Sequence, residues 1–90
     1  MNKLLFTLSA QKDLVRLREF IAAKNPTAAR RISQRLKGSI LRLVEQPDMG
    51  INVDELPGTQ DLITGDYLVR YTILENHIYI LRIWHGKEDR

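Results

Sequence analysis

The feature that most restricts how this chain can fold is its C-terminal segment, residues 66–90, which reads DYLVRYTILENHIYILRIWHGKEDR. Two runs rich in β-branched and aromatic residues flank the polar pair Glu75 and Asn76, which is the pattern of a β-hairpin. A hairpin with one face in water alternates apolar and polar residues. Here both alternating sets contain large apolar side chains, so each face of the hairpin needs a cover.

The size of the chain limits what that cover can be. Ninety residues form one domain, residues 1–90, with a single modest core. No cysteine is present, which excludes a disulfide framework or a thiolate metal site and fits a reducing compartment, so we expect a cytoplasmic protein. The opening MNKLLFTLSA has an apolar run too short to span a membrane and a poor cleavage site for a secretory signal. We therefore interpret it as a first strand.

Apolar periodicity predicts two helices after this strand. We expect Ser9 to cap the first helix, Asp13 to complement its dipole, and the helix to end near Lys24. Asn25-Pro26 starts the second helix, because Asn caps well and proline is tolerated at the first helical position, and Pro47 cannot continue it. The apolar stripes are Ala10, Leu14, Leu17 and Ile21 in the first helix, and Ala29, Ile32, Leu36, Ile40 and Leu43 in the second.

Three more strands are predicted around 60–64, 67–74 and up to about residue 85. The element order is then β-α-α-β-β-β. This order indicates an α+β domain in which an antiparallel helical hairpin packs on a mostly antiparallel four-stranded sheet.

The turn of the last hairpin decides which side chains share a face. A two-residue turn at Glu75 and Asn76 would place Arg82 among core residues, where an unpartnered guanidinium is costly. A three-residue turn that includes His77 avoids this, and we prefer it. The core face is then Tyr67, Val69, Tyr71, Ile73, Tyr79, Leu81 and Ile83, and the opposite face is Leu68, Arg70, Thr72, Leu74, Ile78, Ile80, Arg82 and Trp84.

The helical hairpin shields only one of these faces. An exposed apolar patch marks a binding surface, and the mixture of Trp84, Arg70 and Arg82 has the composition of an interface hot spot. The alternative is that the loop at 47–58 or one helix covers the patch. We predict a partner-binding surface, consisting of Leu68, Arg70, Leu74, Ile78, Ile80, Arg82 and Trp84.

Charge is divided unevenly along the chain. Residues 1–46 hold ten basic and three acidic residues, a net charge of +7, whereas residues 47–90 hold four basic and eight acidic residues, a net charge of −4. The positive field therefore falls mainly on the predicted helices, where Arg31, Arg35 and Arg42 form a basic surface. Such a surface fits an acidic or nucleic-acid partner, and equally a solvated helix face.

Four stretches together resemble the ParE branch of the RelE/ParE toxin superfamily, and they cover nearly the whole chain in order. They are AQKDLVRLREFIAAKNPTAARRI, LVEQPDMGINVDELPG, DYLVRYTI and IYILRIWHGKED. The resemblance implies a RelE/ParE-like fold and the toxin half of a type II toxin-antitoxin pair. It also implies a small, acidic antitoxin with a DNA-binding N-terminal domain, which neutralises the toxin by direct binding in a higher-order hetero-oligomer.

The superfamily includes two activities. The RelE branch cleaves messenger RNA on the ribosome, which requires a base, an acid and a cation for the developing phosphate charge. Ribonuclease members resemble YRLVY where this chain has YLVRY, so Leu68 stands in place of an expected catalytic arginine. A surviving nuclease site would use Arg70 and Arg82 for phosphate, His85 as acid or base, and Lys87 as a second cation. The two histidines form no convincing metal site and the glycines no phosphate cradle, so neither a metal nor another cofactor is expected.

The ParE branch is associated with inhibition of DNA gyrase, which needs surface complementarity and no catalytic residues. We therefore expect a gyrase-binding toxin with no membrane partner. The first alternative is a ribosome-dependent endoribonuclease of the RelE type. The second is a non-toxic nucleic-acid-binding domain that uses Arg31, Arg35 and Arg42.

Overall fold

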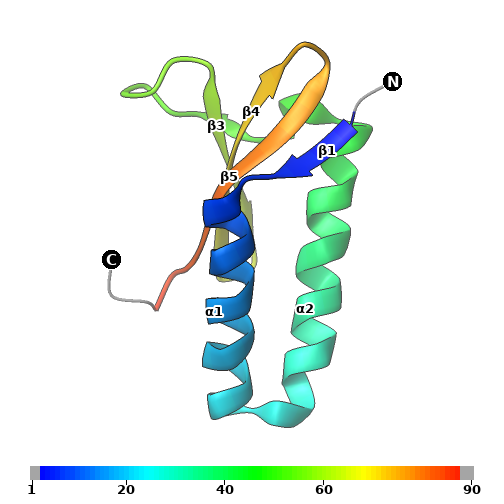
Figure 1. Cartoon of the computed structure of the whole chain (residues 1–90), viewed down its shortest axis with the longest axis vertical. Helices are drawn as coiled ribbons and strands as arrows, with labels where there is room; N and C mark the ends of the chain where they lie inside the picture. The colour runs from blue at the N-terminus through cyan, green and yellow to red at the C-terminus, as the bar shows by residue number, and fades with distance from the viewer. Residues whose placement is uncertain (1–2, 88–90) are drawn as a thin grey trace.

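The computed structural model describes residues 3–87 and has the predicted α+β architecture (Figure 1). The elements are β1 (Lys3–Phe6), α1 (Leu8–Lys24), α2 (Pro26–Leu41), the 3₁₀ turns η1 (Arg42–Val44) and η2 (Pro47–Met49), β2 (Ile51–Asn52), β3 (Thr59–Thr64), β4 (Tyr67–Leu74) and β5 (His77–His85). The strand order in the sheet is β1-β5-β4-β3-β2. No helix within residues 3–87 is both long and apolar enough to cross a membrane.

The sheet has five strands where the sequence predicted four. The extra strand, β2, pairs only Ile51 and Asn52 with β3, so it is too short to produce an alternating pattern in the sequence. All neighbouring strands are antiparallel except β1 and β5, which are parallel. This pairing places the N-terminal strand directly beside the last one, so β5 lies between β1 and β4 inside the sheet.

The helices begin and end close to the predicted positions. Thr7, and not Ser9, caps α1, because its hydroxyl accepts a hydrogen bond from the Ala10 N–H at 3.1 Å. Asn25 caps α2 as predicted and accepts from the Ala28 N–H at 3.1 Å, with Pro26 in the first turn. The two helices therefore run antiparallel and side by side, and Figure 1 shows their linked ends extending beyond the sheet.

The core lies between the helical hairpin and one face of the sheet. Tyr71 is fully buried there, and its hydroxyl accepts from the Gly50 N–H at 2.8 Å while lying 2.8 Å from the Pro47 carbonyl and 2.6 Å from the Gln60 side-chain oxygen. Burial raises the pKa of Tyr71, although the Gly50 N–H opposes this effect. The main buried side chains are Leu17, Ile21, Leu36, Ile40, Leu43, Leu62, Val69, Tyr71, Ile78, Ile80 and Ile83.

The preferred turn of the last hairpin was wrong. Glu75 and Asn76 form a two-residue turn, both with positive φ (54° and 65°), and Ile73 pairs with Ile78. The register then shifts by one residue, since Tyr71 faces Ile80 whereas Arg70 faces Arg82. The extra residue in this β-bulge is Leu81.

The bulge explains which face assignments fail. Before it, Ile78 and Ile80 are fully buried in the core, not on the predicted binding surface. Tyr79 and Leu81 are half-buried on the opposite face, not in the core, and Ile73 is 37% exposed. After the bulge, Ile83 is buried and Arg82 and Trp84 lie on the far face, as predicted. Because of the bulge, the hairpin can have a two-residue turn and still keep Arg82 out of the core.

Candidate functional site

The candidate site is the face of the sheet opposite the core. Cross-strand pairing places Ile63 beside Leu68, and Leu68 beside Trp84. Two of its aliphatic side chains, Ile63 and Leu74, are 62% and 58% exposed. We call this surface the open sheet face, and its members are Ile63, Leu68, Arg70, Thr72, Leu74, Tyr79, Leu81, Arg82 and Trp84.

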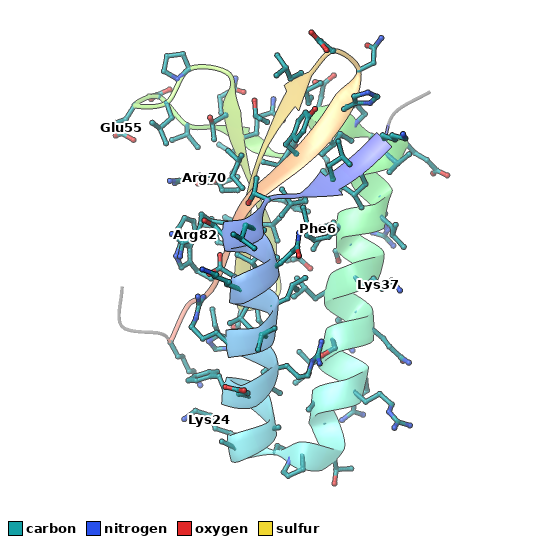
Figure 2. The ribbon with its side chains drawn as sticks, in the orientation of Figure 1. Phe6, Lys24, Lys37, Glu55, Arg70 and Arg82 are labelled. Carbon is teal, nitrogen blue, oxygen red and sulfur yellow. The ribbon has the colours of Figure 1, made fainter. Side chains whose placement is uncertain are left out.

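Trp84 is close to two arginines on this face, Arg70 and Arg82, which pair across β4 and β5. The guanidinium carbons of Arg70 and Arg82 are 5.0 and 5.2 Å from the centroid of its ring, within the range of cation–π contacts. Figure 2 shows Arg70 and Arg82 on the same side of the molecule. Next to Trp84, a cleft of about 250 Å³ is lined by Ile63 and Leu68 among other residues, which is space for an apolar side chain of a partner.

Arg70 is held by Asp61 on the neighbouring strand. Its Nε and Nη2 atoms donate to the two carboxylate oxygens at 2.9 and 3.1 Å, a bidentate pair across β3 and β4. The hydrogen bonds to Asp61 raise the pKa of Arg70 against the opposing effect of its partial burial. The guanidinium is therefore fixed in place over the Trp84 ring.

Arg82 is held by Asp13 of α1, whose side chain is only 3% exposed. Arg82 donates to both carboxylate oxygens at 2.8 and 3.2 Å, the Ile83 N–H donates at 2.8 Å, and Arg16 completes the cluster with an ion pair. Burial alone would raise the pKa of Asp13, but the hydrogen bonds from Arg82, Ile83 and Arg16 together hold it below its ordinary value. The carboxylate is thus charged and fully engaged.

Thr7, which caps α1, and two side chains of α1 form hydrogen bonds with the backbone of β5 beyond the point where β1 ends. The Thr7 hydroxyl donates to the Leu81 carbonyl at 3.0 Å, Asp13 accepts from the Ile83 N–H, and Arg16 donates to the Ile83 carbonyl at 3.0 Å. These backbone groups would otherwise need water or another strand. The start of α1 therefore supports the bulge at Leu81 and the position of Arg82.

The nuclease candidates are not brought together. Arg70 and Arg82 lie on the open sheet face, whereas His85 is on the core side, 9% exposed, with the Phe20 and Tyr67 rings at 5.2 and 4.9 Å. The Nδ1 atom of His85 accepts a hydrogen bond from the Lys87 N–H at 3.0 Å. Arg70 and Arg82 thus lie on one face of the sheet and His85 on the other, although His85 also lines the cleft beside Trp84, and Lys87 is exposed beyond the end of β5.

The predicted basic surface is present on α2 and η1. Arg31, Arg35 and Arg42 are all exposed, and Figure 2 shows Lys37 of the same helix on the side away from Arg70 and Arg82. The charged helix surface and the open sheet face are therefore separate features.

Within residues 3–87, there is no group of three or more histidine, aspartate or glutamate side chains that could hold a metal ion.

The fold resembles that of a protein of known structure. A solved structure titled "Chromosomal ParDE TA system from P. aeruginosa" shares the fold with a TM-score of 0.83 and 22% sequence identity, covering 97% of this chain and 98% of that one. The sequence profile of the family described as "ParE toxin of type II toxin-antitoxin system, parDE" matches residues 4–90. The chain belongs to the ParE toxin family.

Two relatives of this ParE-family toxin have RelE names. They are Toxin RelE1 of Caulobacter vibrioides, 31% identical over 96% of this chain and 95% of the relative, and Toxin RelE2 of the same organism, 29% identical over 96% of this chain and 97% of the relative. The resemblance inferred from the four sequence stretches is thus confirmed. Membership of the ParE family implies that this protein is the toxin of a type II system and has an antitoxin partner.

Sequence reasoning missed several residues of the site in this ParE-family toxin. Asp13 was assigned to the helix dipole, although its spacing from Ala10 and Leu17 places it on the buried stripe of α1, a signal that it has an internal partner. Thr7 was overlooked because its role depends on the bulge at Leu81, 74 residues away in the chain. Ile63 was missed because the strand pairing that brings it beside Leu68 is not visible in either strand alone.

Proposed function

We propose that this ParE-family toxin inhibits DNA gyrase by binding it, without catalysis of its own, in the cytoplasm. The observation that supports this proposal is that most of the side chains a ribonuclease would need are engaged by other residues of the fold. Arg70 and Arg82 are each tied to a buried or half-buried carboxylate, and His85 is 9% exposed on the other face, in contact with the Phe20 and Tyr67 rings. A general acid or base must reach the reacting group within about 3 Å or through one water, and this arrangement favours binding over phosphodiester cleavage.

Gyrase inhibition is tested with purified gyrase and relaxed plasmid. We expect the toxin to reduce ATP-dependent supercoiling and to increase the fraction of plasmid recovered as cleaved DNA, while messenger RNA on translating ribosomes stays intact. Intact supercoiling activity together with cut transcripts would contradict the proposal.

The second candidate is ribosome-dependent cleavage of messenger RNA, favoured by the names of the two Caulobacter vibrioides relatives. Its test uses two variants that keep the packing intact. His85→Phe replaces the imidazole between the rings, and Lys87→Ala removes an exposed cation. If the toxin is a ribonuclease of the predicted type, both variants lose transcript cleavage. If cleavage persists in both, these residues have no catalytic role.

We also propose that the antitoxin binds the open sheet face. The exposed apolar side chains, Trp84 with its two neighbouring arginines, and the adjacent cleft have the composition of an interface centre, since tryptophan and arginine are enriched in such hot spots. The partner is a small, acidic protein with a DNA-binding N-terminal domain, and the complex is a higher-order hetero-oligomer.

The test compares two truncations of apolar side chains. Trp84→Ala should weaken antitoxin binding at least about 30-fold, which corresponds to a hot spot of roughly 2 kcal/mol. Val15→Ala, at a 51% exposed position on α1, is the matched control and should bind as the unaltered toxin does. Binding is measured by titration calorimetry. Equal affinity of the two variants would place the antitoxin elsewhere.

A further inference from the structure

The outer surface of α2 has a charge pattern that the proposed function leaves unused. The helix PTAARRISQRLKGSIL contains no acidic residue, and its basic side chains Arg30, Arg31, Arg35 and Lys37 are all exposed, as is Arg42 in the turn that follows. None of these five residues forms an ion pair within the part of the chain that the structure describes. Their charges are therefore available to a partner.

These cations form two rows along the helix. At about 100° per residue, Arg31, Arg35 and Arg42 fall within roughly 40° of one another, and Arg30 and Lys37 within roughly 20°. The centres of the two rows are about 130° apart around the helix axis, and the longer row extends over about 16 Å. Two rows of charge therefore flank one strip of the surface.

The strip between the rows is nearly neutral and mostly small. It contains Thr27, Gln34, Gly38 and Leu41, and nothing lies within 4 Å of the position where a Cβ would stand on Gly38. A helix with side chains is about 10–12 Å across, close to the width of about 12 Å of the DNA major groove. A helix seated in that groove has a phosphate strand on each side, which matches one cationic row on each side of α2.

The same pattern argues against an acidic polypeptide as the partner. A bound amphipathic segment needs apolar anchors in a groove, and Leu41 is the single large apolar side chain of the strip. A duplex has two parallel rows of negative charge and needs no apolar anchor. Charge complementarity therefore favours DNA.

We propose that the outer surface of α2 binds the phosphate backbone of duplex DNA, independently of sequence, with one cationic row on each strand. This surface lies away from Arg70 and Arg82, as Lys37 in Figure 2 indicates, so DNA and a protein bound to the open sheet face do not compete for it. The proposal goes beyond gyrase inhibition and does not depend on it.

The test measures the affinity of the full chain for two 20-base-pair duplexes of unrelated sequence, by fluorescence anisotropy between 50 and 200 mM salt. With five phosphate contacts, the logarithm of the affinity should fall with the logarithm of the salt concentration with a slope of about −4.5. Arg31→Glu/Arg35→Glu should make the slope less steep by about 1.8, and Arg30→Glu/Lys37→Glu should do the same.

A third double variant provides the matched control. Lys3→Glu/Lys12→Glu changes the net charge by the same −4 at exposed positions outside α2, and its slope should stay near that of the unaltered chain. All variants change exposed side chains, and circular dichroism checks that each is folded. The proposal is overturned if the salt slope of the control falls as much as the slopes of the two row variants, or if only one row variant changes the slope. It is also overturned if poly-glutamate displaces the labelled duplex as well as an unlabelled duplex of equal charge does, or if the chain does not bind DNA at 50 mM salt.

Discussion

Removing the carboxylate of Asp13 should destabilise the fold more than any other single loss of charge on the helices. Asp13→Ala deletes the acceptor of hydrogen bonds from Arg82, Arg16 and the Ile83 N–H. Breaking a buried ion pair costs about 3–5 kcal/mol when the remaining charges stay buried. Here Arg82 and Arg16 are 43% and 40% exposed and regain water, so the main losses are the charge-assisted hydrogen bonds and the unsatisfied Ile83 N–H. We estimate about 3 kcal/mol in the free energy of unfolding.

The assay is urea and thermal unfolding followed by circular dichroism. A loss of about 3 kcal/mol lowers the midpoint temperature of a domain of this size by roughly 12–24 °C. Glu19→Ala, an exposed acid on the same helix, is the control and should change the unfolding free energy by less than about 0.5 kcal/mol. Asp13→Asn keeps an acceptor for the Ile83 N–H and should fall between the two. An Asp13→Ala variant as stable as the Glu19→Ala control would refute the role of the carboxylate.

The same carboxylate makes stability depend on pH. Because the pKa of Asp13 is lower in the folded state than its ordinary value of 3.8, unfolding is accompanied by proton uptake at low pH. Its contribution is fully present above the unfolded pKa and is lost as the pH falls through the folded pKa. Asp13→Asn should remove this part of the acid dependence, which unfolding curves between pH 2 and pH 6 measure. An unchanged acid dependence would contradict the lowered pKa.

Three further predictions concern stability and are measured in the same unfolding assays. Tyr71→Phe removes a buried hydroxyl that lies within hydrogen-bond distance of three groups and should cost about 1–2 kcal/mol, and no change would mean that these contacts are energetically neutral. Gly50→Ala places a Cβ 2.6 Å from the Tyr71 hydroxyl and should lower the free energy of unfolding by more than about 1 kcal/mol. Gly38→Ala meets open space on a helix and should raise it by about 0.5–1 kcal/mol. A Gly50→Ala variant more stable than Gly38→Ala would contradict the packing. Replacing Glu75 by Asn and Asn76 by Gly suits the two positive φ angles and should stabilise by about 0.5–1 kcal/mol, and a loss of stability would argue against this turn.

Local signals predicted the elements of this toxin well. Asn25-Pro26 marks the break between the helices because capping and the restricted φ of proline act within a few residues. The strand ending at Leu74 and the one ending at His85 were found for the same reason, since β-branched runs and turn residues are local features. The resemblance to a known family then supplied the class of function.

The register of the hairpin could not be predicted because the feature that decides it is not local. The sequence argument assumed one register along both strands and rejected the two-residue turn to keep Arg82 out of the core. The structure reaches the same end through a bulge at Leu81, whose carbonyl is satisfied by Thr7 from the other end of the chain. For the candidate site, this means that Arg70, Arg82 and Trp84 were placed correctly, while Ile78 and Ile80 were not.

The parallel pairing of β1 with β5 has a consequence for the time at which this protein becomes able to act. Each residue of β1 pairs with a residue 74 positions later in the chain, from Lys3 with His77 to Phe6 with Ile80. Contacts of such long range form late, so a nascent chain still lacking residues 77–85 has neither its inner strand nor Trp84. Strand β5 is the only link between β1 and the other strands of the described sheet, so the open sheet face exists only after residues 77–85 have been synthesised and paired.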